Sequence, residues 1–303
     1  MKNRLGQASA GRDASASYSF GVRCQLRMET VSQLRMETVR MSLSRRIWIR
    51  RNVFWELAKR DVAGRYSGSF FGLLWSFLNP LLMLAVYTLA FRVFLGMRWP
   101  NMESGADFSL MIFCGMIVHS LLAECIMRAP SVIVSQSNLV KRVVFPLAIL
   151  PCVMVASTLF NALLSLLVLL IFVLISRHTL HPTVLYLPLL YAPYVLLLCG
   201  VSWLMASLGV FIRDLTQLAG VISSMLMFLS PVFYPASNLH EPYRDWIALN
   251  PLTLMIEQTR QLVLFGQSPD WHALGIYTLA SVAVLLLGYF WFQRTRDGFA
   301  DVL

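Results

Sequence analysis

The stretch RDVAGRYSGSFFGLLWSFLNPLLMLAVYTLAFRVF, from Arg60 to Phe94, decides the fold of this chain. Its first residues include charged side chains, but Ser67 to Phe91 contains none. A helix needs about 20 apolar residues to cross the hydrocarbon core of a bilayer. Hydrocarbon offers no water to the backbone, so a run this long and apolar is stable there as a helix that satisfies its own N–H and C=O groups. The stretch therefore predicts a membrane span.

The composition of the whole chain also indicates a membrane protein. Of its 303 residues, 57% are hydrophobic and only 13% are charged, too few to cover a soluble domain of this size. The net charge of +10 comes from Lys and Arg residues at the ends of apolar runs, a topology signal rather than a nucleic-acid-binding one. The cysteines show no C-x-x-C pair, so no metal or redox site is predicted.

Five further apolar runs follow the first one. We predict an all-α membrane protein with six transmembrane helices, at about 67–94, 108–127, 147–175, 183–212, 215–235 and 273–292. Most Lys and Arg residues of the connections fall on the side that holds both termini, and the positive-inside rule places that side in the cytoplasm. Residues 296–303 are then a cytoplasmic tail.

Two segments precede the first span. Residues 1–43 are polar, Arg-rich and contain QLRMETV twice, which predicts a disordered tail or a mis-called N-terminal extension. Residues 44–66 predict a cytoplasmic amphipathic helix in the membrane interface, because Trp and Arg side chains suit the headgroup layer. The residues expected to hold it there are Trp48, Trp55, Arg60 and Arg65.

Two connections are long enough to form structure of their own. The cytoplasmic segment 129–145 could place a short helix across the inner face of the membrane. The residues that it would present to a partner protein are Asn138, Leu139, Lys141 and Arg142. The outer segment 238–268 predicts two short helices broken at Asn250-Pro251, since Pro suits the first turn of a helix. Their apolar faces must be buried, so we expect them to re-enter the outer leaflet.

Polar side chains near the spans have plain and functional interpretations. A carboxylate such as Glu124 inside a span often marks a polar pathway, but Glu124 could simply pair with Arg128 one turn later. His119 could face a water-filled route or bond to a neighbouring helix. Asp214 is expected to cap the helix that begins at residue 215.

Five motifs resemble those of a known family. They are Ser69-x-x-Gly72-x-x-Trp75 with Asn79-Pro80-Leu81, Asn138-Leu139-Val140-Lys141 with Phe145-Pro146 and Leu150-Pro151, Arg213-Asp214, Ser230-Pro231-x-x-Tyr234-Pro235, and Asn250-Pro251-Leu252. In this order and spacing, from about Arg60 to Phe265, they resemble the type-2 ABC exporter permeases that move O-antigen, capsular polysaccharide and teichoic acid. Ala148 stands where many such permeases carry Glu, which leaves the detail of coupling open.

The resemblance implies a bacterial inner-membrane subunit that forms a homodimer and binds two copies of a separate ATPase. The chain has no G-x-x-x-x-G-K-[ST] loop, so no cofactor is expected in it, and ATP and Mg²⁺ would bind the partner. In such permeases the connection after span two couples to the ATPase, and the re-entrant helices help to gate the outer exit. The expected function is export of a lipid-linked polysaccharide, with the sugar, chain length and lipid carrier left open.

A conduit for a glycan should be lined by aromatic rings, because the C–H faces of sugars stack on them. The candidates are Trp75, Tyr87, Phe91, Phe228, Phe233 and Tyr234, for each of which core packing or interface anchoring is the plainer interpretation. Proline bends helices, so the outer end of span five and the re-entrant break supply the candidate gate residues Pro231, Pro235, Asn250 and Pro251.

Two other functions remain open from the sequence. One is an ABC-2 permease for a lipid or a drug. The other is a polytopic membrane enzyme that acts on polyprenyl-linked sugars, which would need an essential outer carboxylate such as Glu241, Asp245 or Glu257. Because no catalytic motif is present, we expect a transport subunit rather than an enzyme.

Overall fold

The computed structural model describes residues 43–66, 70–94, 105–137, 145–236, 240 and 243–303, and every regular element within them is helical. The chain divides into two compact units, Met1–Phe54 and Trp55–Leu303. Of the first unit, the structure describes only residues 43–54, which open helix α2 (Leu43–Tyr66). Residues 1–42 of the predicted N-terminal extension and the coupling residues 138–142 lie outside the described residues. All other described residues, from Trp55 onward, belong to the second unit.

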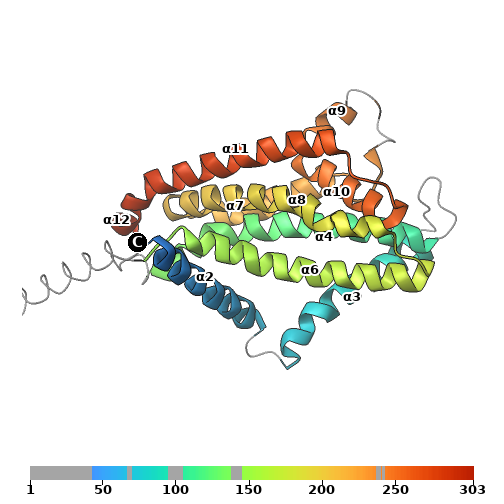
Figure 1. The fold of residues 1–303 in the computed structure, drawn as a ribbon, viewed down its shortest axis with the longest axis horizontal. Helices are drawn as coiled ribbons and strands as arrows, with labels where there is room; N and C mark the ends of the chain where they lie inside the picture. The colour runs from blue at the N-terminus through green and yellow to red at the C-terminus, as the bar shows by residue number, and fades with distance from the viewer. Residues whose placement is uncertain (1–42, 67–69, 95–104, 138–144, 237–239, 241–242) are drawn as a thin grey trace, which may run out of the picture. The chain divides into compact units, whose positions relative to one another are not determined.

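Four helices in the described part of the chain are long and apolar enough to cross a membrane. They run alongside one another in Figure 1 and are α4 (Gly105–Val132), α6 (Ile149–Arg177), α7 (Leu187–Phe211) and α11 (Trp271–Thr295). Two shorter apolar helices, α3 (Trp75–Tyr87) and α8 (Leu215–Leu229), lie where the sequence predicts spans one and five. A π-helical segment, η2 (Thr88–Phe94), continues α3.

Short elements complete the described chain. They are η1 (Gly72–Leu74), η3 (Val134–Gln136), η4 (Pro182–Tyr186), α9 (Tyr243–Ala248), α10 (Pro251–Arg260), η6 (Gln261–Phe265), η7 (Arg296–Gly298) and α12 (Phe299–Val302). The predicted break at Asn250-Pro251 is confirmed, because α10 begins there and the Asn250 side chain accepts a hydrogen bond from Leu252 N at 2.9 Å. Gly266, whose positive φ of 65° suits glycine, ends η6.

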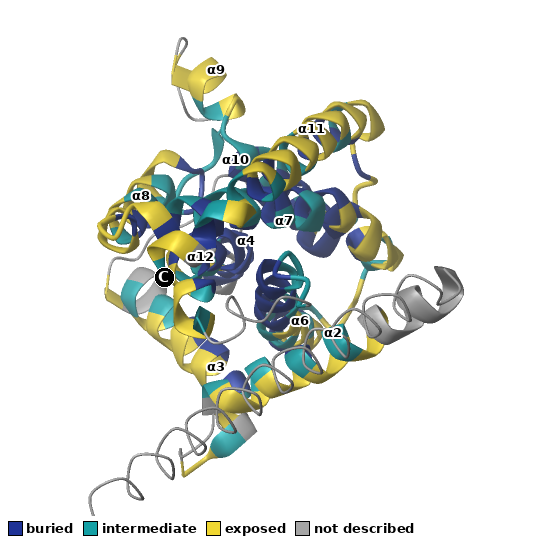
Figure 2. Ribbon diagram, turned by 90° about the vertical axis from the view of Figure 1, so that its left-hand side faces the viewer, coloured by how far each residue is buried: buried dark blue, intermediate teal, exposed yellow. Residues whose placement is uncertain are grey.

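Helix α4 is the centre of the unit. It packs against α3, α6, α7, α8 and α10. In the apolar 18-residue stretch of α4, 78% of the residues are buried, against 22% in the corresponding stretch of α11. Figure 2 shows buried residues on α4 and on the sides of its neighbours that face it, with exposed residues on the outer sides. His119 of α4 is 5% exposed and bonds Ser223 O of α8 at 3.1 Å, so the packed interpretation of this residue is confirmed.

The ends of α8 and α4 differ from the predictions. Helix α8 ends at Leu229 rather than at 235, because Ser230 is extended and Pro231 has no N–H for a helical hydrogen bond. Helix α4 passes the predicted end at 127 and continues to Val132, with Pro130 inside its last turn. The expected cap at α8 is wrong, since Asp214 precedes the helix but makes no side-chain capping bond.

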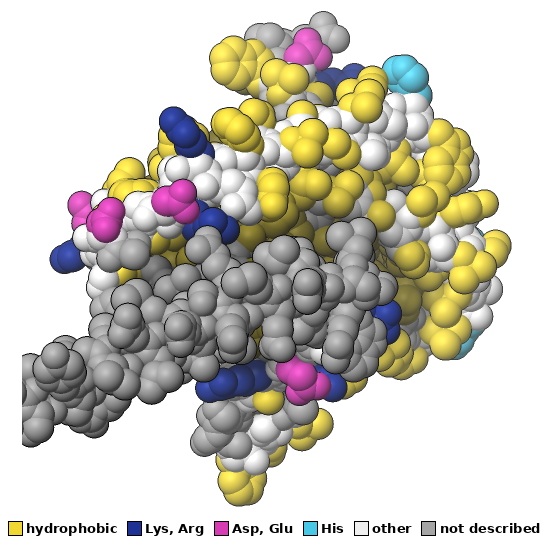
Figure 3. All heavy atoms as spheres, turned by 60° about the vertical axis from the view of Figure 1, so that its left-hand side comes forward, with side chains coloured by type: hydrophobic (Ala, Val, Ile, Leu, Met, Phe, Trp, Pro, Cys, Tyr) yellow, Lys and Arg dark blue, Asp and Glu magenta, His cyan; other side chains and the backbone are white. Residues whose placement is uncertain are grey.

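The described surface is largely apolar. Exposed hydrophobic side chains lie along α3, α8 and α11, including Leu82, Val86, Met225, Leu279 and Leu287. In Figure 3 hydrophobic side chains dominate the right-hand part of the visible face, and most charged side chains lie to the left or at the upper and lower margins. Such a surface fits contact with lipid rather than with water.

Helices α7 and α11 touch through glycine. A Cβ atom on Gly288 would lie 2.2 Å from Gly200 O, and one on Gly200 would lie 2.6 Å from Val284 O. Small residues allow this backbone approach between membrane helices, where van der Waals contact replaces the hydrophobic effect as the source of association.

We expect Gly288→Ala to lower the apparent Tm of the purified protein by several degrees, because the new methyl group must force the two backbones apart. Gly275→Ala, in the same helix but with open space around its Cβ position, is the matched control and should leave Tm unchanged. Thermal unfolding in detergent, followed by size-exclusion fluorescence, measures both. Equal Tm values for the two variants would contradict the close contact.

Candidate functional site

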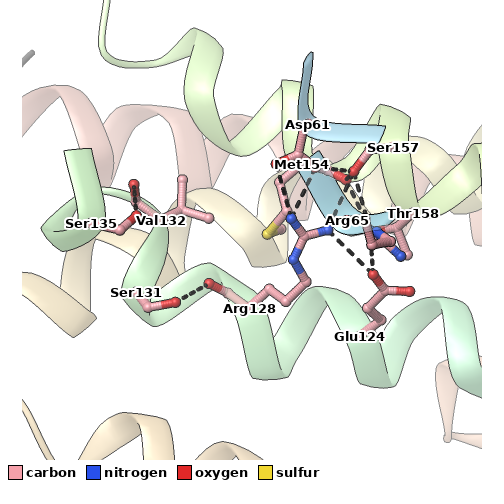
Figure 4. Close-up of polar contacts among 10 residues, drawn as sticks. All are labelled: Asp61, Arg65, Glu124, Arg128, Ser131, Val132, Ser135, Met154, Ser157 and Thr158. Atoms are coloured by element: carbon pink, nitrogen blue, oxygen red, sulfur yellow. Dashed lines mark hydrogen bonds and ion pairs between the residues drawn. The ribbon is translucent and has the colours of Figure 1, made fainter. Parts of the chain in front are cut away.

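Four charged side chains and a serine form a cluster between α2, α4 and α6. Arg128 Nη2 lies 2.9 Å from Asp61 Oδ2 and 3.1 Å from Asp61 Oδ1, and Arg128 Nη1 lies 3.2 Å from Glu124 Oε1. Arg65 Nη2 lies 2.5 Å from the same Glu124 oxygen. Figure 4 shows these side chains pointing toward one another from the three helices. We call Asp61, Arg65, Glu124, Arg128 and Ser157 the ion-pair cluster.

Ser157 of α6 connects the charges. Its hydroxyl accepts hydrogen bonds from Arg65 Nη2 at 3.2 Å and Arg128 Nη1 at 3.3 Å, and it donates one to Asp61 Oδ2. Two carboxylates and two guanidinium groups leave the cluster formally neutral. The fifth member thus ties α6 into a network that otherwise joins only α2 and α4.

The surroundings give the cluster moderate strength. The four charged side chains are between 21% and 32% exposed, so solvent screens them less than surface pairs but still reaches them. A cavity of about 650 Å³ opens beside the cluster and is also lined by Leu57, Ser131, Gln136 and Phe145. The geometry suits holding the end of α2 against α4 and α6.

Sequence reasoning found part of this cluster. The expected pairing of Glu124 with Arg128 is confirmed, and Arg65, expected at the membrane interface, points instead to Glu124. Neither Asp61 nor Ser157 was predicted to have a role. A signal for Asp61 was present, because Asp61 and Arg65 repeat on α2 the acid-to-base spacing of four residues that Glu124 and Arg128 have on α4.

A second polar centre surrounds the turn after α8, Ser230–Pro235. Asn250 Nδ2 donates to Ser230 Oγ at 2.9 Å and to Leu229 O at 3.2 Å. Arg260, 4% exposed, donates from Nη2 to Val232 O at 2.7 Å and from Nε to Met111 O at 3.0 Å. The two ends of α10 therefore hold this turn, and Arg260 also links it to α4. The candidate gate residues Pro231 and Pro235 both belong to the turn.

No role was predicted for Arg260 from the sequence. Leu252, Ile256 and Arg260 are spaced four residues apart on α10, and all three are buried. An arginine in line with an apolar stripe was the available signal for its inward direction. Nearby, burial raises the pKa of the Glu257 carboxyl above its ordinary value, and the charge of Arg260 acts in the opposite direction.

The candidate conduit aromatics fall into two groups. Phe228 and Phe233 lie with ring centroids 6.3 Å apart, and Tyr234 Oη donates to Phe228 O at 3.2 Å. On α3, Trp75 contacts Phe71 edge-on at 5.7 Å, and Tyr87 packs on the hydrophobic core. Phe91 lies in η2, and its side chain is outside what the structure describes.

The remaining predicted residues have varied surroundings. Trp55 and Arg60 of α2 are exposed, whereas the side chain of Trp48 is not among those described. Asp245 is exposed on α9, Glu257 lines a cavity of about 450 Å³ with Arg244 and Arg260, and Glu241 lies outside the described residues. Within the described part of the chain, no group of three or more His, Cys, Asp or Glu could hold a metal ion.

Residues 52–264 match the ABC-2 type transporter family, whose members are membrane components of ABC transporters, and the chain belongs to this family. The match spans the ion-pair cluster, the turn after α8 and all of α10.

Curated relatives are similar over nearly their whole length. The O-antigen export system permease protein RfbA of Myxococcus xanthus is 29% identical over 263 residues, covering 86% of this chain and 98% of that protein. RfbA of Klebsiella pneumoniae is 23% identical over 252 residues, covering 82% and 93%. The polysialic acid transport protein KpsM of Escherichia coli is 20% identical over 239 residues, covering 78% and 91%. The predicted resemblance to polysaccharide export permeases is confirmed.

We expect Arg128→Met to lower the free energy of unfolding by about 1–3 kcal/mol, because it leaves the partly buried carboxylates of Asp61 and Glu124 with less compensation. Lys59→Met removes an exposed pair with Glu56 and should cost less than about 0.5 kcal/mol. Thermal unfolding of both variants measures the difference. A cost for Lys59→Met equal to that of Arg128→Met would show that the cluster adds nothing beyond a surface pair.

The two functions of Asn250 can be separated by substitution. Asn250→Ala removes the cap of α10 and the bonds to the turn after α8, and we expect a loss of about 1–2 kcal/mol. Asn250→Asp keeps a capping acceptor but loses the amide donor, so it should cost less while still loosening the turn. The rate of thiol labelling of a cysteine placed at Phe233 reports how firmly the turn after α8 is held. If both variants label as slowly as the parent, the turn after α8 is not held by Asn250.

Proposed function

We propose that this chain is the transmembrane permease subunit of an ABC transporter that exports a lipid-linked polysaccharide, an O-antigen or a capsular chain. The observation that carries the proposal is the similarity to proteins named for O-antigen export and polysialic acid transport, over 91% to 98% of their length. The apolar surface and the helices long enough to cross a membrane support it.

The proposal includes six crossings of the bacterial inner membrane, with both termini in the cytoplasm. Four crossings are the long helices, and the other two are α3 with η2 and α8. Helix α8 has 15 residues, which extend only about 22 Å at 1.5 Å per residue. The turn after α8 would complete the crossing, where Asn250 and Arg260 supply hydrogen-bond donors to its backbone. Helices α9 and α10 would re-enter the outer leaflet and help to gate the exit.

The energy would come from a separate ATPase that binds ATP and Mg²⁺, in two copies for each homodimer of the permease. Broad apolar faces of α3 and α8 are exposed, and lipid or a second copy of the chain would cover them. Asn138, Leu139, Lys141 and Arg142 would contact the ATPase, between the end of α4 and the start of α6. Through the ion-pair cluster, a displacement of α4 would carry α2 with it.

Reconstitution tests the proposal. Proteoliposomes that contain the permease and its ATPase should move labelled lipid-linked polysaccharide when ATP is added, and liposomes with either protein alone should not. Transport by the permease without the ATPase would reject the energy source that we propose. If ATP drives movement of a lipid or a drug but not of the polysaccharide, the proposed cargo is wrong. If this chain alone converts a polyprenyl-linked sugar, the chain is an enzyme.

The coupling segment has its own test. Lys141→Ala with Arg142→Ala should reduce ATP-dependent transport several-fold, because the double substitution removes both charges that we assign to the ATPase contact. Lys59→Ala removes an exposed charge from α2 and serves as the control. Co-purification of the ATPase and transport are measured together. Full coupling in the double variant would exclude these two side chains from the contact.

A further inference from the structure

A third cavity, of about 350 Å³, lies between α3, α4 and α6, and Arg65 and Glu124 connect it to the ion-pair cluster. Its volume lies at the small end of the range for ligand sites, about 300–1,000 Å³. We call it the α3 cavity. We propose that the α3 cavity binds a neutral sugar unit of the cargo through hydroxyl and amide groups, an inference that rests on the proposed function.

Polar side chains make up most of the residues that line the α3 cavity. Besides Arg65 and Glu124 it contains Ser76 and Asn79 of α3, Ser120 of α4, and Thr158 and Ser165 of α6. Figure 4 shows Thr158 beside Ser157, so neighbouring residues of α6 serve the cavity and the cluster. A cavity built for an acyl chain would be lined by aliphatic side chains. Hydroxyl and amide groups are suited to a ligand that both donates and accepts hydrogen bonds, as sugar hydroxyls do.

The hydroxyls divide into two kinds. Those of Ser120, Thr158 and Ser165 donate to backbone carbonyls of their own helices, at 3.0, 2.9 and 3.0 Å. Each oxygen still has lone pairs that can accept a hydrogen bond from a ligand. Ser120 and Ser165 therefore offer acceptors to the cavity without any change in their own bonds, whereas Thr158 is only 1% exposed.

Ser76 is the exception and points to a ligand. It is 5% exposed, and its hydroxyl has no hydrogen-bond partner among the residues that the structure describes. Ser76 is the second residue of α3, and its hydroxyl does not bond a carbonyl of the preceding turn η1. A buried polar group without a partner destabilises the protein, and a ligand hydroxyl would remove that cost.

Charge and shape favour a neutral sugar over an anion. Arg65 pairs with Glu124, so the charged end of the cavity is compensated and does not present a free cation for a phosphate. Trp75 also lines the cavity and is 38% exposed, which leaves a ring against which a sugar can stack. In this proposal Trp75, one of the candidate conduit aromatics, stacks on the face of a sugar ring.

Photo-crosslinking tests the site in the full permease with its ATPase in nanodiscs. Benzoylphenylalanine replaces Asn79, which is exposed and lines the cavity, or Leu82, an exposed residue of α3 outside it. The probes are lipid-linked polysaccharide from the producing cells and the same polymer freed from its lipid. We expect both probes to attach at position 79 and neither at position 82. Equal attachment at the two positions, or attachment of the lipid-linked probe alone, would overturn the sugar site.

Ser76→Ala distinguishes a binding hydroxyl from a structural one. Loss of one neutral hydrogen bond of about 0.5–1.5 kcal/mol should reduce the crosslinking yield at position 79 by about two- to tenfold. Tm should stay the same or rise, because the variant removes an unpaired buried hydroxyl. An unchanged yield, or a fall in Tm that accompanies the loss of yield, would overturn the assignment of Ser76.

The two proposals fail in different ways. If reconstituted parent protein transports the polysaccharide but position 79 captures neither probe, the sugar site is wrong and the export function stands. If the parent protein transports no polysaccharide in the presence of ATP and its ATPase, the export function is wrong, and the sugar site falls with it.

Discussion

The burial of α4 is the constraint on which the rest of the structure depends. A mostly buried helix satisfies its own backbone in the middle, but polar side chains toward its ends need partners from other elements. Toward one end, Glu124 and Arg128 pair with Arg65 and Asp61 of α2. Toward the other, Met111 O accepts from Arg260 of α10. The elements that close the two ends of the unit are therefore attached to the same central helix.

Much of the fold could be predicted from local sequence. Long apolar runs identify membrane helices because the bilayer allows few alternatives, and Asn250-Pro251 is a local start signal that the structure confirms. Helix ends were harder to predict. A hydropathy run does not distinguish helix from extended chain, so the end of α8 at Leu229 was masked by the apolar residues that follow it. Four described helices are long enough to cross the membrane and two further apolar helices are shorter, so the count of six crossings is a proposal.

The sites were predicted only in part, because they depend on contacts between distant segments. Glu124 with Arg128 is a pair within one helix and could be recognised by spacing alone. Ser157 could not, since a serine in an apolar helix acquires its role only when α2 and α4 are packed beside it. Arg260 resembles a surface charge in the sequence because positive residues are common in the connections of membrane proteins. Its direction follows from the stripe that it shares with Leu252 and Ile256.

The glycine contact between α7 and α11 has a mechanical consequence. With Gly200 and Gly288 backbone against backbone, the two helices have no clearance between them at this contact. A pair packed this closely is suited to be a stator, a fixed reference frame against which other helices are displaced. In a transporter that changes shape in every cycle, the more loosely packed helices would move. The stator would return the subunit to the same starting geometry each time.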